Sequence, residues 1–179
     1  MSDQGPNPSI HVSVLPRETI DNLSVKAGSV VIDGTLGGGG HTRKIAEIVG
    51  KDGLVIGLDR DPEAIMRCEV SLAGQPVVLS QSNFSEASEV LEELGLRKVD
   101  GILLDLGLSS DQLEDQTRGF SFNSDGPLDL RFDKHEGEPA YRLVNRMRQE
   151  HLANLIYEFG DERLSRRIAR KIVALRGQQ

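Results

Sequence analysis

The stretch from Ser29 to His41 limits the fold of this 179-residue chain more than any other part of it. It opens with a short apolar, β-branched run over 29–32, which predicts a buried parallel strand that ends at Asp33. Five of the next seven residues are glycines, which destabilise helix and strand interiors but suit a turn with positive φ that a ligand can approach closely. A helix is predicted over 42–49. Strand, glycine-rich turn and helix together indicate the ligand-binding end of an open α/β sheet.

Two more acids follow predicted strands in the way that Asp33 does. The remaining strands are predicted over residues 54–58, 76–80 and 99–104. Asp59 follows the first of these and Asp105 the last. Because the carboxyl ends of parallel strands meet at one edge of a sheet, we expect the three acids to lie at the same edge, where ligands bind.

Asp59 has two interpretations. In nucleotide-binding α/β folds, an acid at the end of the second strand, about 20 residues beyond the glycines, accepts hydrogen bonds from ribose hydroxyls. Asp59 could instead cap the helix predicted over 62–71, but Asp61 precedes Pro62 at the first helical position and suits that cap better. We therefore favour the ribose contact for Asp59.

Phe84 and His11 keep alternatives open on local sequence alone. Phe84 lies just beyond the third predicted strand, where an aromatic ring could stack on a flat ligand, and ordinary core packing is equally compatible. His11 could contact a substrate or cofactor, although a surface position in an N-terminal arm is the favoured interpretation.

The chain changes character after residue 108. Residues 109–133 hold many turn formers and few apolar residues, a composition usual for functional or disordered loops. Because Phe120, Phe122 and Leu128 are interleaved among them, we predict an ordered wall over the strand ends. Helices are then predicted over residues 141–148, 150–159 and 162–175.

The last predicted helix is amphipathic. Its apolar side chains share one face at helical spacing: Leu164, Ile168, Ile172 and Leu175. Five arginines and lysines between 163 and 171 occupy the other face. This basic face is a candidate phosphate-binding surface, and a simple solvated helix face is an equal alternative.

Charge and cysteine content exclude several classes of protein. The chain has 21 Lys+Arg against 28 Asp+Glu and a net charge of −7, which argues against an evenly basic nucleic-acid coat but not against a local basic face. Cys68 is the only cysteine, so no intramolecular disulfide and no cysteine zinc site can form, and we expect no metal. No apolar run approaches the roughly 20 residues that span a bilayer, and we expect a cytoplasmic protein.

The glycine loop also limits the cofactor. It lacks the G-x-G-x-x-G spacing of a dinucleotide site and the Gly-Lys-Ser/Thr of a P-loop. Residues 33–39 instead fit D-x-[GT]-x-G-x-G, which resembles motif I of class I S-adenosylmethionine (SAM)-dependent methyltransferases. Acids at three strand ends suit a cationic sulfonium better than a pyrophosphate. A nucleotide-dependent oxidoreductase, the rival class, would need the pyrophosphate loop that is absent.

Further motifs narrow the resemblance to one family. They begin with His11-Val12-x-Val14-Leu15-x-x-Glu18 and continue, after the glycine loop, with Leu104-Asp105-Leu106-Gly107, Arg118-Gly119-Phe120-Ser121-Phe122 and Asp125-Gly126-Pro127-Leu128-Asp129. In this order they resemble the RsmH (MraW) family, whose members methylate N4 of a cytidine in the decoding region of 16S (small-subunit) ribosomal RNA. The resemblance implies an α/β fold: a Rossmann-like class I methyltransferase core in residues 1–108, and an active-site loop with the start of an inserted helical substrate domain in residues 109–179.

The resemblance also implies roles for individual residues. Gly39, Gly40 and His41 would hold the tail and ribose side of SAM, Asp59 the ribose, and Phe84 the adenine. The cofactor site would be completed by Asp33, Gly37, Asp105 and Gln112. No covalent intermediate is needed, because the exocyclic amine of cytosine would attack the SAM methyl directly, and Asp105 and Asp129 are the candidates for accepting its proton.

Family members continue well beyond the basic helix and return to the core with further strands. This chain would therefore form an incomplete core, with four strands in the order 3-2-1-4. The alternative to an active methyltransferase is a truncated, catalytically inactive fragment that still binds SAM.

Overall fold

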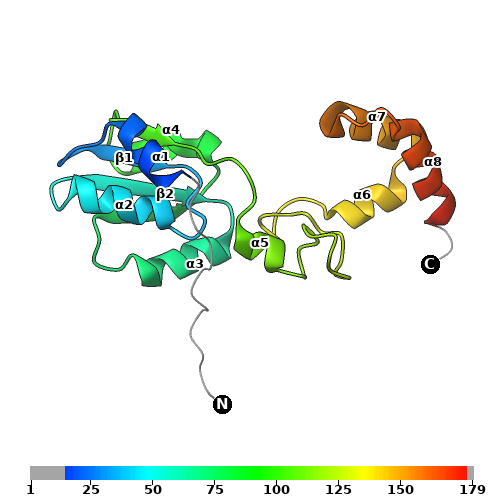
Figure 1. Ribbon diagram of the computed structural model, residues 1–179, viewed down its shortest axis with the longest axis horizontal. Coiled ribbons are helices and arrows are strands. Elements are labelled where there is room, and N and C mark those ends of the chain that lie inside the picture. Colours follow the sequence, from blue (N-terminus) through cyan, green and yellow to red (C-terminus); the bar gives the residue numbers. More distant parts are fainter. Residues whose placement is uncertain (1–14, 177–179) are drawn as a thin grey trace, which may run out of the picture. The chain divides into compact units, whose positions relative to one another are not determined.

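The computed structural model describes residues 15–176 of the chain. They form two compact units that divide between Glu114 and Asp115 (Figure 1), and each unit is described by itself. The first unit holds the sheet, and the second holds a long loop and three helices. None of the helices in the described range combines the length and the apolar character needed to cross a membrane. His11 lies outside the described residues.

Four strands of the first unit form one parallel sheet in the order β3-β2-β1-β4, which confirms the predicted order. The strands are β1 (Val30–Asp33), β2 (Leu54–Asp59), β3 (Val77–Gln81) and β4 (Gly101–Leu103). In the register of the sheet, Val31 of β1 pairs with Val55 on one side and with Gly101 on the other. Strand β4 is shorter than the predicted strand over 99–104.

Helices connect the strands, as parallel pairing requires. The connecting helices are α2 (Gly40–Val49), α3 (Pro62–Ser71), and the 3₁₀ turn η1 (Phe84–Glu86) with α4 (Ala87–Glu93). Helix α1 (Pro16–Leu23) precedes β1, and α5 (Ser110–Glu114) follows β4. The predicted cap of α3 is confirmed, because the Asp61 carboxylate accepts a 3.0 Å hydrogen bond from the backbone N–H of Glu63. Asp59 is thereby not needed as the cap.

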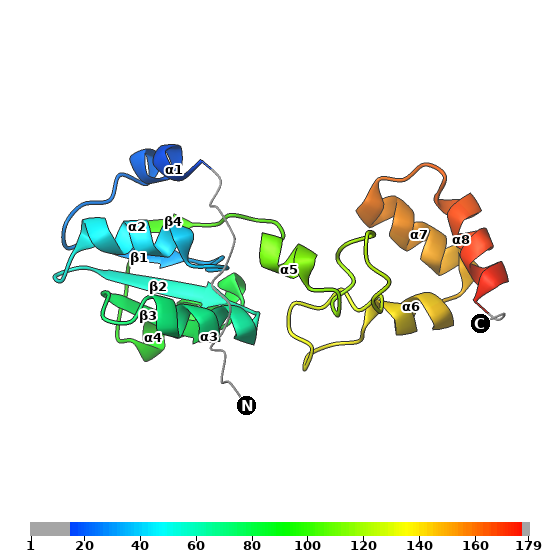
Figure 2. The same cartoon turned by 60° about the horizontal axis from the view of Figure 1, so that its bottom comes forward.

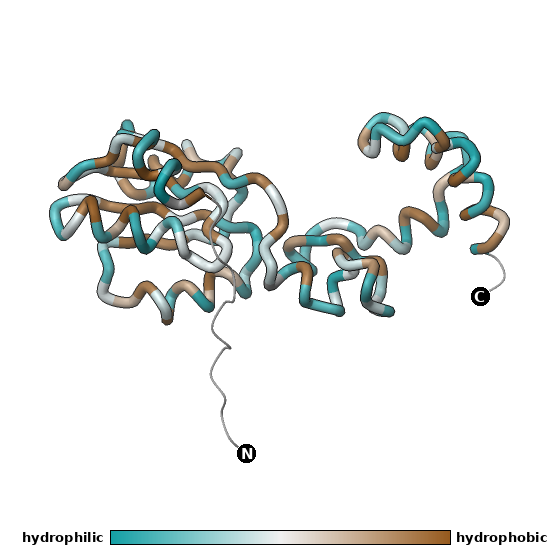
Figure 3. The backbone as a smooth tube through the Cα atoms, viewed as in Figure 1, coloured by the Kyte–Doolittle hydropathy of each residue, from teal (hydrophilic) through white to brown (hydrophobic). Residues whose placement is uncertain are grey.

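The two faces of the sheet are covered by different helices. On one face Val31 and Val55 pack with Ile45 and Val49 of α2. Their neighbours in the strands point to the other face, where Ile32 and Ile56 join Leu58 and Val90 of α4 in a second cluster. Each fully buried aliphatic side chain contributes about 1.5–3 kcal/mol, so this alternation fixes the strands between two helical layers. Figure 2 shows the layers from a second direction, and Figure 3 shows the strands as mainly apolar segments.

The second unit begins with a loop over residues 115–139 and continues with α6 (Ala140–Arg146), α7 (Gln149–Gly160) and α8 (Ser165–Leu175). The loop has internal structure: Phe120 and Phe132 pack with ring centroids 5.5 Å apart, and the buried Arg118 donates to a carboxylate oxygen of Asp115 at 2.9 Å. Helices α7 and α8 form an antiparallel hairpin, since Arg176 after α8 donates to the backbone oxygen of Met147 before α7.

The face of α8 that packs differs from the predicted apolar face. Ala169 is fully buried against Leu152 and Ala153 of α7, and Ile172 and Val173 border this contact. Three residues of the predicted face remain uncovered: Leu164, Ile168 and Leu175. The small side chains of Ala153 and Ala169 let the helices approach along a line beside the predicted face, which periodicity alone does not distinguish.

Candidate cofactor site

The loop between β1 and α2 needs glycine at two positions. Gly37 and Gly39 have φ angles of 51° and 75°, in the left-handed region that favours glycine. A Cβ atom on Gly39 would also lie 2.9 Å from Sγ of Cys68 and 3.3 Å from the Leu72 side chain. The loop therefore rests directly on α3 and the residue that ends it, with no side chain between.

Asp33 ties the two ends of this loop together. Its carboxylate is buried and accepts hydrogen bonds from Oγ1 of Thr42 at 2.6 Å and from the backbone N–H of Thr35 at 3.2 Å. Burial raises the pKa of the Asp33 carboxyl, and these two hydrogen bonds oppose that effect. The contacts fix the start of α2 relative to the end of β1.

Asp59 ties the same loop to the neighbouring strand. One oxygen of its carboxylate accepts a 2.8 Å hydrogen bond from the backbone N–H of Gly37, and the other accepts one of 2.9 Å from Asp61. Burial raises the pKa of the Asp59 carboxyl. The backbone of Arg60 also hydrogen-bonds to this carboxylate. A carboxylate has about four lone-pair sites, so acceptor capacity still remains for a ligand hydroxyl.

Asp105 is linked to the loop from the other side of β1. Its backbone N–H donates to Oγ1 of Thr35 at 2.7 Å. Its carboxylate lies 3.7 Å from Nε2 of His41, and the Asp105 side chain is 37% exposed. The other ring nitrogen of His41, Nδ1, is buried and has no hydrogen-bond partner among the described residues. A buried ring nitrogen without a hydrogen-bond partner costs free energy, so a ligand that hydrogen-bonds to Nδ1 would be favoured at this position.

Phe84 and Gln112 complete the set of predicted residues. Phe84 is 44% exposed, and a Cβ atom on Gly34 would lie 2.9 Å from its Cβ and 2.6 Å from the Leu104 side chain. Phe84 thus lies against the ends of β1 and β4 with an accessible ring. Gln112 is buried and exchanges hydrogen bonds with Ser109, accepting from its backbone N–H at 3.0 Å.

The contacts bring most of the predicted residues together at one sheet edge. Asp33, Asp59, Asp105 and His41 all bond to the glycine loop or to one another, whereas no described contact joins Gln112 to them. Sequence reasoning assigned no role to Thr35 or Thr42. Thr35 occupies a position of the glycine motif where either Gly or Thr fits. The presence of a hydroxyl group at that position is the sequence signal that could have indicated a hydrogen-bonding role.

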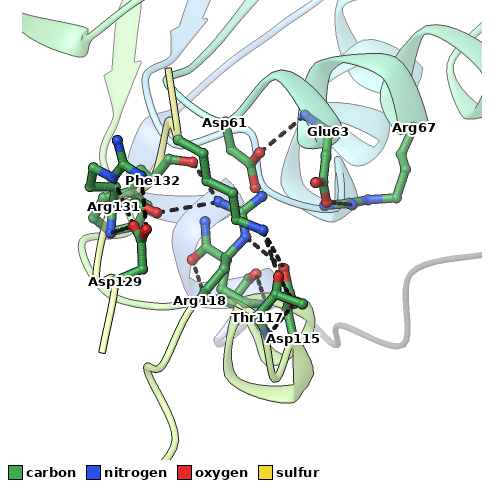
Figure 4. Close-up of polar contacts among 12 residues, drawn as sticks. Asp61, Glu63, Arg67, Asp115, Thr117, Arg118, Asp129, Arg131 and Phe132 are labelled. Carbon is green, nitrogen blue, oxygen red and sulfur yellow. Dashed lines mark hydrogen bonds and ion pairs between the residues drawn. The ribbon is translucent and has the colours of Figure 1, made fainter. Parts of the chain in front are cut away.

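Asp129 lies in the loop of the second unit, which Figure 4 shows in detail. Its buried carboxylate forms a bidentate ion pair with Arg131, whose Nε and Nη2 each donate a hydrogen bond at 2.8 Å. The hydrogen bonds from Arg131 hold the pKa of the Asp129 carboxyl below its usual range. A carboxylate held in this way is a weak base and a firm anchor for the guanidinium.

A parallel α/β sheet with a glycine-rich loop after its first strand, and acids at the ends of three strands, defines a Rossmann-like cofactor-binding protein. Within that class the chain belongs to the MraW methylase family, whose family model matches residues 8–179.

Individual relatives are similar along most of this chain. Ribosomal RNA small subunit methyltransferase H of Syntrophotalea carbinolica is 48% identical over 171 residues, which are 94% of this chain and 54% of the relative. The protein of the same name from Geotalea uraniireducens is 48% identical over 168 residues, with 93% and 54% covered. The chain spans about half the length of these relatives. Among solved structures, a SAM-dependent methyltransferase from Aquifex aeolicus is 22% identical, covers 38% of either chain and has a TM-score of 0.35.

Proposed function

We propose that this chain binds SAM at the carboxyl ends of β1, β2 and β4 and methylates N4 of a cytidine in the decoding region of 16S ribosomal RNA. The observation that carries the proposal is a pair of hydrogen bonds that hold the glycine loop from both sides. Gly37 donates to the carboxylate of Asp59 in β2, and Thr35 accepts from the backbone N–H of Asp105 after β4. Such a loop exposes backbone where a ligand without phosphates needs close approach. The names of the relatives support RNA methylation as the reaction.

Each site residue has a part in this proposal. The backbone of Gly37, Gly39 and Gly40 would face the cofactor, and the unpaired Nδ1 of His41 would hydrogen-bond to it. Asp59 would use its remaining lone pairs for the ribose hydroxyls. Asp33 would act by holding the loop, because its oxygens already bond to Thr42 and Thr35. The exposed ring of Phe84 would pack on the adenine and Gln112 would close the site.

SAM supplies an electrophilic methyl group. The residues of this chain would align the cytosine amine with that methyl group and exclude water. Asp105 is the better of the two candidate proton acceptors, because its side chain is partly exposed. Asp129 is the second candidate, but its pairing with Arg131 makes it the weaker base.

RNA is the proposed partner of the second unit. Residues 163–171 include four arginines and one lysine, all on the exposed side of α8 or just before it. Phosphates of RNA are the natural counterpart of such a surface. Small ribosomal subunits as substrate would place this activity in the cytoplasm.

Binding of SAM without methyl transfer is the second candidate function. One observation favours it: β4 pairs with β1 alone among the described strands, and Ile102 in β4 is 55% exposed. Native proteins usually shorten, charge or cover an edge strand that exposes apolar side chains.

Two measurements test the proposal. Isothermal titration should give heat with SAM and none with NAD, and binding of NAD alone would overturn the cofactor assignment. Tritium transfer from labelled SAM to small ribosomal subunits should then label the RNA at cytidine N4. Binding without transfer would establish the second candidate function instead.

A further inference from the structure

The α7–α8 hairpin carries an exposed tyrosine that neither its core nor the cofactor site uses. Tyr157 of α7 is 57% exposed, although its neighbour Ile156 packs against α8. Arg166 and Arg170 of α8 are also exposed, and each directly follows a buried residue, Ser165 or Ala169.

The antiparallel arrangement places these three side chains on one side of the hairpin. Each residue of an α-helix turns by about 100° from the one before it. Helices α7 and α8 run in opposite directions. In each helix, therefore, the residue immediately after one that contacts the other helix points to the same side of the hairpin. Tyr157 follows Ile156, as Arg170 follows Ala169. We call Tyr157, Arg166 and Arg170 the tyrosine face.

The opposite side of the hairpin is apolar. Phe159 lies two residues beyond Tyr157, so its side chain turns by about 200° and points away from the tyrosine face. It is 85% exposed. Ile168 precedes the contact residue Ala169 and shares this second side with Leu164 and Leu175. The hairpin therefore separates an aromatic and basic side from an apolar one.

The charge of the helical segment complements a polyanion. Residues 140–176 contain nine arginines and lysines against four acids, a balance of +5, while the whole chain carries −7. Exposed aromatic rings beside arginines are the combination by which proteins bind unpaired nucleic acid, because a ring stacks on any base and a guanidinium binds the backbone phosphate.

We propose that the tyrosine face binds unpaired RNA, with a base stacked on Tyr157 and phosphates bound by Arg166 and Arg170. The inference rests on the proposed function, since it names the surface that would contact the RNA substrate. It commits to one side of the hairpin and assigns no RNA contact to Phe159, which is the more exposed aromatic residue.

A pair of single-tryptophan variants of the full chain tests this geometry. The chain has no tryptophan, so Tyr157→Trp and Phe159→Trp each introduce the only indole. Stacking of a base should quench the fluorescence of the indole at position 157 when a short oligocytidylate is added. The indole at position 159 is the matched control and should keep its fluorescence. Equal quenching at both positions, or none at 157, overturns the proposal.

A second readout is the affinity of the same oligocytidylate for single variants that lack the tryptophan substitutions. Tyr157→Leu should weaken binding about tenfold, because stacking on an aromatic ring is worth about 1–3 kcal/mol and leucine offers none. Arg166→Ala and Arg170→Ala should each reduce the slope of log affinity against log salt by about 0.7, the value for one phosphate of a single strand.

Lys51→Ala is the charge control, because Lys51 is exposed in the turn before β2 and lies outside both the hairpin and the basic residues 163–171. It should leave that slope nearly unchanged, and a loss equal to that of Arg166→Ala would contradict the proposed face. SAM titration of every variant separates the two proposals. If SAM binds normally but substitutions in the tyrosine face do not change the affinity for oligocytidylate, this inference fails and the proposed function stands. If SAM itself does not bind, the proposed function fails.

Discussion

Thr35 and Asp105, 70 positions apart, are joined by a 2.7 Å hydrogen bond from the backbone N–H of Asp105 to Oγ1 of Thr35. A second bond, from the N–H of Gly34 to the backbone oxygen of Leu103 at 2.9 Å, runs beside it. Together they extend the short β1–β4 pairing beyond the last residue of β4. The position of the Asp105 carboxylate next to His41 therefore depends on the Thr35 side chain.

Replacing Thr35 by valine should weaken SAM binding without preventing folding. Thr35→Val keeps the shape of the side chain but removes the acceptor, which costs about 1–2 kcal/mol and frees the loop that carries Asp105. We expect the Kd for SAM to rise about tenfold by isothermal titration. Thr35→Ser, which keeps the hydroxyl, is the control and should bind nearly normally. Equal losses in both variants would show that the missing methyl group, not the hydrogen bond, matters.

The packing of the glycine loop on α3 predicts a difference between two glycines with similar φ angles. Gly39 and Gly95 have φ of 75° and 70°, so alanine at either position has a backbone cost of about 1–2 kcal/mol. Only at Gly39 would the new Cβ meet another atom, Sγ of Cys68 at 2.9 Å; nothing lies within 4 Å at Gly95.

We therefore expect Gly39→Ala to lower the free energy of unfolding more than Gly95→Ala does, by at least about 1 kcal/mol in urea titrations. It should also weaken SAM binding, whereas Gly95→Ala should bind SAM as the unchanged chain does. Equal destabilisation by the two substitutions would mean that the loop shifts freely away from α3.

Local sequence signals were sufficient for the strands and for the cap of α3. The β-branched runs predicted β1 and β2 to within a residue, and Asp61 before Pro62 identified the cap because capping involves only neighbouring residues. The strand order came from the family resemblance, and the structure confirms it.

Two features could not be predicted because they depend on residues distant in the chain. The role of Thr35 requires β4 to lie beside β1, and nothing near Thr35 in the sequence indicates which backbone N–H its hydroxyl will meet. On α8, the sequence contains two adjacent lines of apolar or small residues. The choice of the line through Ala169 depends on Ala153 of α7, which allows close approach there.

The Asp129–Arg131 pair predicts a pH dependence of the loop in the second unit. The pKa of the Asp129 carboxyl is lowered in the folded chain, so the pair stabilises the loop above the unfolded pKa of 3.8, and this stability is lost as the pH falls through the lower folded value. The backbone N–H groups of Leu130 and Ala140, which bond to Arg118 and Asp129, should lose protection from hydrogen exchange as the pH drops below about 4.

Asp129→Asn is the control for that measurement. It lacks the titrating carboxyl, so its protection should be reduced at neutral pH already and should change little as the pH falls, once intrinsic exchange rates are taken into account. Protection that falls equally with acid in both proteins would assign the pH dependence to another group, such as Asp115, whose pKa is also lowered.

Cys68 offers a reporter for ligand binding, because it is the only cysteine and lies directly beneath the glycine loop. Its side chain is fully buried, and burial raises the pKa of its thiol to about 11. Since the thiolate is the reactive form, a thiol reagent should modify Cys68 only when the loop or the first unit opens. SAM at 100 times its Kd should slow this reaction about 100-fold, because binding suppresses opening by about 2.7 kcal/mol. The unfolded chain in urea, which should react at the same rate with and without SAM, is the control. Rapid modification of the folded chain that SAM does not slow would contradict both the burial of Cys68 and the location of the cofactor above it.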